Sequence, residues 1–170
     1  NYGPSRKLTG QPKEVFAIMN YAVDDNERPI FYKKVVETVV HEFCHSFTKI
    51  KGDTEKALEK SGKALQEYTY FSMRRQAYST WRNILEESLV RAATICYLID
   101  HDYDEKDIRN AIIEQVDRNF FWMPELVQTL RYYKSHRKKY PTFTSFYPEI
   151  IRFFDRYVAD VEKEIQKALK

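Results

Sequence analysis

Glycine and cysteine are scarce in this chain of 170 residues, which contains four glycines, six prolines and two cysteines. Few glycines and prolines leave little material for tight turns, so the composition favours long helices. Two cysteines cannot form a multi-disulfide framework, and a chain of this length can bury a core without disulfides or a structural metal. Any metal ion that the chain binds is therefore expected to serve function rather than folding.

Long apolar runs are also missing. No segment approaches the roughly 18 residues that a membrane span needs, and no signal peptide is visible. The net charge of +3 is too small to indicate a nucleic-acid partner, so we expect neither a membrane nor a nucleic acid as partner. The chain begins at Asn1, which is compatible with a mature secreted or periplasmic form or with a fragment of a longer chain, so localisation stays open.

Apolar periodicity predicts a short N-terminal strand followed by helices, in one domain that spans all 170 residues. The strand is expected at 14–23, where apolar and aromatic residues end at a run of turn-forming residues. Thr54 and Asp104 are expected to cap the helices that follow them. Pro141 and Pro148 are expected to bracket an aromatic loop before the last helix. The predicted helices span about 32–50, 54–75, 79–99, 105–120, 125–136 and 149–170.

Residues 41–45 read His-Glu-Phe-Cys-His, an H-E-x-x-H pentad inside an apolar-periodic stretch. On a helix, His41 and His45 lie one turn apart on the same side, so their imidazoles can bind one zinc ion. Glu42 is placed to accept a proton from a zinc-bound water. This combination is typical of metallopeptidases and predicts Zn²⁺ as the cofactor.

A helical wheel of residues 35–50 places the apolar residues, Phe43 and Phe47 among them, on one arc that we expect to face the core. His41 and His45 lie opposite the centre of this arc. That position argues against histidines buried among apolar side chains. A plain solvated surface is the alternative interpretation of this polar side.

A catalytic zinc site needs a third protein ligand. The best donors are Glu86 and Glu87, on the helix predicted at 79–99. The wheel of this helix places Glu86 within the apolar arc and Glu87 on a polar strip with Arg91 and Thr94. If this strip faces the polar side of the pentad helix across a cleft, Glu87 meets both histidines. Glu87 is therefore favoured over Glu86 as the third metal ligand.

These two helices resemble the gluzincin branch of zinc metallopeptidases, in which an H-E-x-x-H helix is followed by a glutamate on a second helix. The segments His-Glu-Phe-Cys-His-Ser-Phe and Glu-Ser-Leu-Val-Arg-Ala are similar to an uncharacterised bacterial family of predicted zinc peptidases, known only as a domain of unknown function. The resemblance implies an α+β, predominantly α-helical, zincin-like domain with a small N-terminal β element. It also implies that Glu42 is catalytic and that Zn²⁺ is bound by His41, His45 and Glu87.

The resemblance covers mainly 32–50 and 80–98, and the chain departs from it in two places. Forty-one residues separate His45 from Glu87, more than in thermolysin-like enzymes. Those enzymes also carry an aspartate one turn after the third ligand, where this chain has Arg91. An arginine cannot accept a hydrogen bond from a ligand histidine, so any residue that orients the histidines must lie elsewhere. We expect Arg91 to form a salt bridge with a glutamate of its own helix rather than to bind a substrate carboxylate.

The predicted function is peptide-bond hydrolysis by a zinc metallopeptidase, with a peptide or protein as substrate. Glu42 activates the zinc-bound water and then delivers the proton to the leaving amine. The strand at 14–23 is either an edge that binds an extended peptide or an ordinary core strand. The oligomeric state is open, as is the residue that stabilises the oxyanion, for which the candidates are Tyr78, His136, Tyr140 and Tyr147.

Two other interpretations compete with this one. The first is a non-catalytic binding module with a vestigial metal site, in which the cations and aromatics of 131–140 bind single-stranded nucleic acid. A solvated helix end is the simpler explanation of that tract. The second is an independent metal site at His101, Asp102 and Asp104, for which a turn and a helix cap are the simpler explanation.

Overall fold

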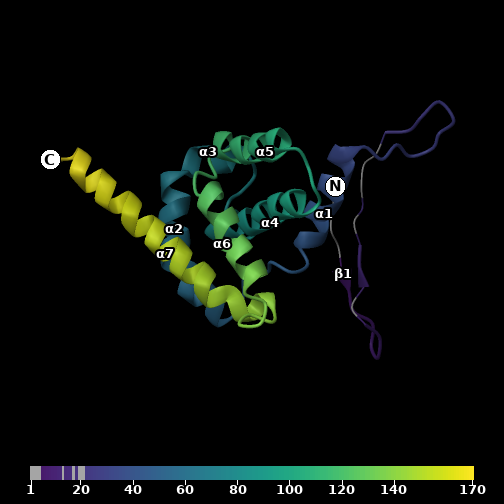
Figure 1. Ribbon diagram of the computed structural model, residues 1–170. Helices are drawn as coiled ribbons and strands as arrows, with labels where there is room; N and C mark the ends of the chain where they lie inside the picture. Colours follow the sequence, from purple (N-terminus) through teal and green to yellow (C-terminus); the bar gives the residue numbers. More distant parts are fainter. Residues whose placement is uncertain (1–4, 13, 17, 19–21) are drawn as a thin grey trace.

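The computed structural model describes residues 5–12, 14–16, 18 and 22–170, and it is drawn in Figure 1. Two short strands, β1 (Ser5–Arg6) and β2 (Glu14–Val15), form an antiparallel pair. The prediction of a predominantly helical chain with a small N-terminal β element is confirmed. No helix in this described part is long and apolar enough to cross a membrane. The helices are α1 (Lys33–Cys44), α2 (Asp53–Tyr68), α3 (Tyr70–Arg75), α4 (Trp81–Asp100), α5 (Glu105–Asp117), α6 (Met123–Ser135) and α7 (Phe143–Ala168).

The N-terminal β element is smaller than predicted. Within 14–23, only Glu14–Val15 forms a strand, and several of the other residues lie outside the described part of the chain. Val23 forms an isolated bridge with Pro29 and is 48% exposed. In Figure 1 the described residues of this segment lie away from the helices, on the side of α1. The described residues of the segment therefore do not form a core strand.

The helix α4 lies at the centre of the fold and packs against α1, α2, α5 and α6, while α2 also packs along α7. Thr80 caps it by accepting a hydrogen bond from the N–H of Asn83. Buried residues occur on most of its sides, as expected for a helix surrounded by others. The indole N–H of Trp122, itself in the core, donates to the hydroxyl of Ser88 at 2.9 Å. These contacts fix α4 as the support for any side chain that it presents to α1.

Two predicted helix caps are wrong in detail. The helix α2 begins at Asp53, one residue before Thr54, and its N-cap residue is Gly52, whose φ of 62° suits glycine. Asp104 does occupy the N-cap position of α5, but its side chain accepts no capping hydrogen bond. Local side-chain chemistry thus located these helix starts to within a residue without identifying the groups that cap them.

Two other boundaries also differ from the prediction. The second predicted helix divides into α2 and α3 at Thr69, whose backbone leaves helical conformation at φ −116° and ψ 14°. The aromatic loop predicted between Pro141 and Pro148 instead forms the first turns of α7. Thr142 and Ser145 form a capping box that starts this helix before Pro148, and Pro148 lies exposed on the helix surface.

The helix α1 is shorter than predicted, because it ends at Cys44 rather than near Ile50. The amide of Phe47 and the hydroxyl of Thr48 both donate to the carbonyl of Cys44, which closes the helix end. The chain then turns toward α4, where the carboxylate of Glu86 accepts a hydrogen bond from the N–H of Ile50 at 2.9 Å. This anchor ties the segment after α1 to the central helix.

The prediction that the apolar arc of α1 faces the core is wrong at the end of the helix that carries the pentad. Phe43 and Phe47 are 40% and 68% exposed, whereas Glu42 is buried. At the two ends of the predicted arc, Val35 and Ile50 are buried, as predicted. The physical reason lies in α4, which presents the carboxylate of Glu87 toward α1. A carboxylate removed from water needs polar partners, so the polar side of the pentad turns inward.

Gly62 lies inside α2, where the ring of Trp81 packs directly on its backbone. A β-carbon at this position would lie 2.5 Å from Cε3 of Trp81. We expect Gly62→Ala to lower the free energy of unfolding by about 1–3 kcal/mol, because overpacking outweighs the gain of roughly 1 kcal/mol in helix propensity. Urea unfolding measures this change. The control Lys60→Ala, at an exposed position of the same helix, is expected to be neutral or slightly stabilising. Equal stability of the two variants would contradict the close contact.

Candidate metal centre

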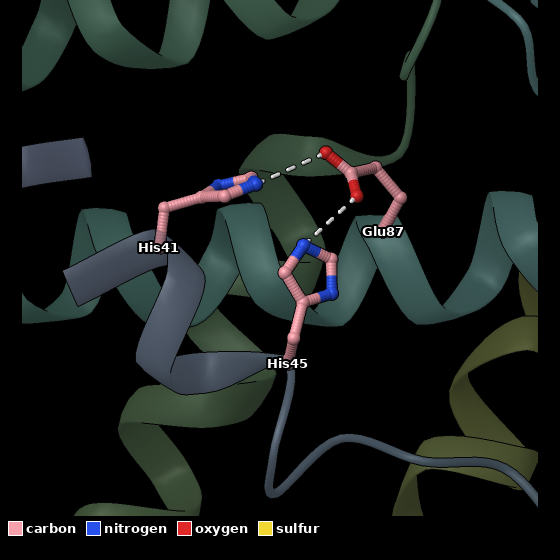
Figure 2. Close-up of side chains that lie close together, drawn as sticks. All are labelled: His41, His45 and Glu87. Atoms are coloured by element: carbon pink, nitrogen blue, oxygen red, sulfur yellow. Dashed lines mark ion pairs between the residues drawn. The ribbon is translucent and has the colours of Figure 1, made fainter. Parts of the chain in front are cut away.

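The side chains of His41, His45 and Glu87 come together between α1 and α4 (Figure 2). Nε2 of His41 lies 3.4 Å from Oε1 of Glu87, and Nε2 of His45 lies 3.7 Å from Oε2. One ligand atom from each of the three residues lies within 4.8 Å of the others. The three side chains predicted as ligands are thus neighbours, and as a group they could hold a metal ion.

The two histidines keep their helical spacing although α1 ends between them. His41 lies in the last turn of α1, and His45 is its C-cap residue with φ −54° and ψ −25°, which is still right-handed helical conformation. The two rings therefore share one side, with centroids 5.0 Å apart and planes inclined at 82°. In Figure 2 both rings point toward Glu87, which reaches across from α4.

Adjacent glutamates of α4 have different surroundings. Glu87 lies beside both histidines, whereas Glu86 accepts hydrogen bonds from the backbone of Ile50 at 2.9 Å and from Nζ of Lys49 at 3.0 Å. The carboxylate of Glu86 thus holds the chain that follows α1. Of the two glutamates, only Glu87 has the geometry of a third ligand.

Arg91 forms the closest charged contact of Glu87, as predicted for a salt bridge within α4. Its guanidinium lies 2.8 Å from Oε1 of Glu87 and donates to the hydroxyl of Tyr78 at 3.0 Å and to the side-chain carbonyl of Gln115. The guanidinium also lies over the ring of Phe120, 5.0 Å from its centroid. One carboxylate oxygen of Glu87 is therefore already paired with a cation.

Burial lowers the pKa of His41 to about 4, since the nearby cationic groups add to the desolvation and the carboxylate of Glu87 opposes it only in part. His41 is thus neutral at pH 7, and its contact with Glu87 is not an ion pair at that pH. A neutral imidazole is the form that binds a metal ion. The side chains of His41 and His45 are 23% and 26% exposed, which leaves them accessible to an ion from solvent.

The donor atoms fit a four-coordinate ion. Bonds of about 2.05 Å in a tetrahedral zinc site place two ligand atoms roughly 3.3 Å apart. Nε2 of His41 lies 3.4 Å from Oε1 of Glu87 and Nε2 of His45 lies 3.7 Å from Oε2, so each imidazole is near this spacing from one of the two carboxylate oxygens. Two imidazoles and one carboxylate also leave one position of a tetrahedron open, as catalytic sites require.

A pocket of about 330 Å³ opens beside this group, between α1, α4 and α5. His41 and Glu42 both line it, so the pentad glutamate is buried from bulk solvent but borders the pocket. Charged side chains of both signs form much of the remaining wall, among them Lys34, Glu114 and Arg118. The pocket gives a small polar group access to the space next to His41.

Of the four predicted oxyanion candidates, only Tyr78 lies beside the metal-binding group, through its contact with Arg91. Burial raises the pKa of Tyr78, so its hydroxyl stays protonated at pH 7. The other three candidates bond elsewhere: Tyr147 to the carbonyl of Lys49, Tyr140 to Glu149, and His136 to the carbonyl of Tyr132.

The alternative metal cluster does not assemble. Within the described ranges, His101, Asp102 and Asp104 do not form a group with converging ligand atoms. His101 is the C-cap residue of α4, and its Nδ1 lies 2.8 Å from the carbonyl of Tyr97. Asp102 has a positive φ of 54°, and Asp104 is the N-cap residue of α5. The three residues thus lie at a helix end, in a turn and at a helix start, as the simpler explanation predicts, although the side chain of Asp104 accepts no capping hydrogen bond.

The tract 131–140 covers the end of α6 and the turn after it. Arg137 lies over the ring of Tyr133, 4.6 Å from its centroid, and donates to the carbonyl of Pro141. The cation and the aromatic ring thus pack on each other.

Gln115 is the residue of this centre that sequence reasoning missed. It lies on α5, is 8% exposed, and bonds to Arg91 through its side-chain carbonyl. A glutamine within an amphipathic helix carries no signal of such a role. Its position became apparent only from the packing of α5 against α4.

A model of the family described as Domain of unknown function (DUF4932) matches residues 1–153. The chain belongs to this family. The match includes α1 and α4 whole, so the candidate metal centre lies inside the DUF4932 region. Comparison with curated proteins and with solved structures found no significant match. The predicted membership of a domain family of unknown function is confirmed, and the DUF4932 description names no activity.

The lowered pKa of His41 makes the stability of the metal-free DUF4932 chain depend on pH. The unfolded chain takes up a proton at His41 near pH 6.5, whereas the folded chain does so near pH 4. Because the unfolded state binds more protons between these values, stability falls as the pH decreases from 6.5 toward 4. We expect His41 to contribute a loss of about 2 kcal/mol between pH 7.5 and pH 5.

Urea unfolding of chelator-treated protein at these two pH values measures this loss. In His41→Asn the difference between the two pH values should shrink by about 2 kcal/mol. His136→Asn, at an exposed histidine, serves as the control and should behave like the unmodified chain. A pH dependence that is unchanged in His41→Asn would contradict the burial argument.

Proposed function

We propose that this chain is a zinc-dependent metallopeptidase with a zincin-like site, in which His41, His45 and Glu87 bind Zn²⁺ and Glu42 is the catalytic residue. One observation carries the proposal. Ligand atoms of three residues from two helices converge within 4.8 Å, and Glu42 lines the pocket that opens beside them.

The donor set favours zinc over magnesium and calcium. Two imidazole nitrogens and one carboxylate oxygen form the ligand set of many catalytic zinc sites, whereas magnesium and calcium prefer oxygen ligands alone. When bound, Zn²⁺ would act as a Lewis acid and lower the pKa of a coordinated water toward about 7. His41 suits the role of a zinc ligand because its imidazole is neutral at pH 7.

Glu42 would move the proton in the reaction. Its carboxylate borders the pocket one residue from His41, where it can accept a proton from the attacking water. The peptide nitrogen needs a proton before it can leave, and the protonated Glu42 supplies it. Arg91 and Tyr78 lie close to Glu87, and the hydroxyl of Tyr78 is the nearest neutral donor among the candidates for oxyanion stabilisation.

The charged wall of the pocket suits a substrate that has polar groups near the cleaved bond. Lys34 lies 3.1 Å from Glu37 and 3.7 Å from Glu114, and Arg118 lies 2.7 Å from Glu114. These wall charges pair with one another, whereas Glu42 forms no ion pair with a described residue. A peptide backbone, with its alternating donors and acceptors, suits such a wall.

A non-catalytic binding module with a vestigial metal site is the second candidate, and one contact favours it. Arg91 already pairs with Glu87 and so neutralises part of the ligand set. In a vestigial site, the ion pair would replace the metal. Metal content and turnover separate the two candidates.

Zinc content is the first test. The unmodified protein, prepared with added zinc, should retain close to one equivalent in elemental analysis. Glu87→Gln should lower zinc affinity by roughly 100-fold or more, because loss of a ligand exceeds the roughly 10–100-fold cost of losing an outer partner. The neighbouring Glu86→Gln is the matched control and should retain the ion. Equal affinity of the two variants, or an unmodified protein without zinc, would refute the assigned ligands.

Turnover is the second test, measured as cleavage of a fluorescently labelled unfolded protein by the zinc-loaded form. Glu42→Gln should reduce the rate by about 10²–10⁴-fold while zinc content stays unchanged, because the amide cannot accept the proton. Glu37→Gln changes another carboxylate of the same pocket and should keep most activity. A Glu42→Gln variant as active as the control would exclude the proposed base.

A further inference from the structure

Arg91 is held more firmly than any other cation of the site. Its side chain is 12% exposed, and its terminal nitrogens contact Glu87, Tyr78 and Gln115. Its Nε is buried without a hydrogen-bond partner among the described residues. The guanidinium is therefore fixed through its outer nitrogens by α4, by α5 and by the turn before α4.

The charge of Arg91 distinguishes it from a neutral outer partner. A ligating carboxylate ordinarily accepts hydrogen bonds from outer groups, and a neutral donor leaves its negative charge largely available to the ion. A guanidinium 2.8 Å from Oε1 of Glu87 carries a full positive charge, so it withdraws electron density from the carboxylate and repels a dication. Low exposure of both side chains leaves this repulsion weakly screened.

The contact with Arg91 also gives the two carboxylate oxygens of Glu87 different surroundings. Oε1 lies 2.8 Å from Arg91 and 3.4 Å from Nε2 of His41, while Oε2 faces Nε2 of His45 at 3.7 Å. Because Arg91 pairs with Oε1, an ion that binds Oε2 alone meets less repulsion than one that binds both oxygens. One-oxygen ligation suits a four-coordinate ion with an open position.

We infer that Arg91 is a positioning residue that holds Glu87 in place for one-oxygen ligation and, by its charge, weakens the hold of the site on its metal ion. The inference rests on the proposed metal site and extends it to how tightly the ion is bound. A site of this kind is preformed without metal and exchanges the ion readily. We therefore expect the purified protein to contain zinc only if the ion is supplied during preparation.

Zinc affinity of charge variants tests the inference, measured by competition with a chromophoric chelator at fixed pH and ionic strength. Arg91→Gln keeps hydrogen-bonding groups but removes the charge, and it should bind zinc at least tenfold more tightly than the unmodified protein. Arg91→Lys keeps the charge and should remain within about threefold of it. Arg91→Met is a second neutral variant for the case that the glutamine variant fails to fold, as judged by circular dichroism.

The zinc affinities of the Arg91 variants distinguish a role of the charge from a merely structural role of the side chain. Tighter binding by a neutral variant supports a role of the charge, whereas a merely structural role of Arg91 would weaken binding when the side chain is replaced. Unchanged or weaker binding by the folded neutral variant overturns the inference and leaves the peptidase proposal standing if the unmodified protein binds zinc. Zinc bound only by the neutral variant supports the inference and refutes the peptidase proposal. Absence of zinc from both refutes both.

Discussion

The burial of the Glu87 carboxylate is the constraint on which the arrangement of this molecule depends. The residue is 7% exposed on the central helix, and removing an ionised carboxylate from water is costly unless charges or hydrogen-bond donors compensate it. Arg91 supplies a cation from the same helix, and His41 and His45 supply polar groups from α1. The position of Glu87 therefore determines which side of α1 turns toward the core.

The candidate metal centre therefore lies between α4, which is firmly packed, and the end of α1, which is weakly anchored. The helix α4 is surrounded by other helices and carries a large part of the hydrophobic core. The last turn of α1 and the residues just after it contribute little to that core, since Phe43 and Phe47 lie at the surface. Polar contacts at Glu87 and the bond from Ile50 to Glu86 hold this part of the chain instead. An ion bound between the two helices would add a link where apolar packing is thin.

Part of this arrangement follows from sequence alone. The spacing of His41 and His45 places both rings on one side of any helix, and the wheel of the later helix separates Glu87 from Glu86. Both arguments use local geometry, which the backbone period determines. They hold even though α1 ends at Cys44, because His45 keeps helical dihedral angles.

The remaining features depend on tertiary contacts that no local pattern contains. The apolar arc with Phe43 predicts the wrong inward face of α1, because burial of polar groups on α4 outweighs the burial of two phenylalanines. The start of α7 depends on the pair Thr142 and Ser145, whose mutual hydrogen bonds make the first turn stable ahead of Pro148. Gln115 reaches the site from α5, and only the packing of the helices brings it there.

The central claim is that one ion occupies the space between the two histidines and Glu87. An anomalous difference map from a crystal of the zinc-loaded protein, measured on both sides of the zinc absorption edge, tests it most directly. The account predicts one strong peak within bonding distance, about 2.0–2.2 Å, of Nε2 of His41, Nε2 of His45 and one oxygen of Glu87. A map without a peak at this place, or with zinc bound only by other residues, would contradict it.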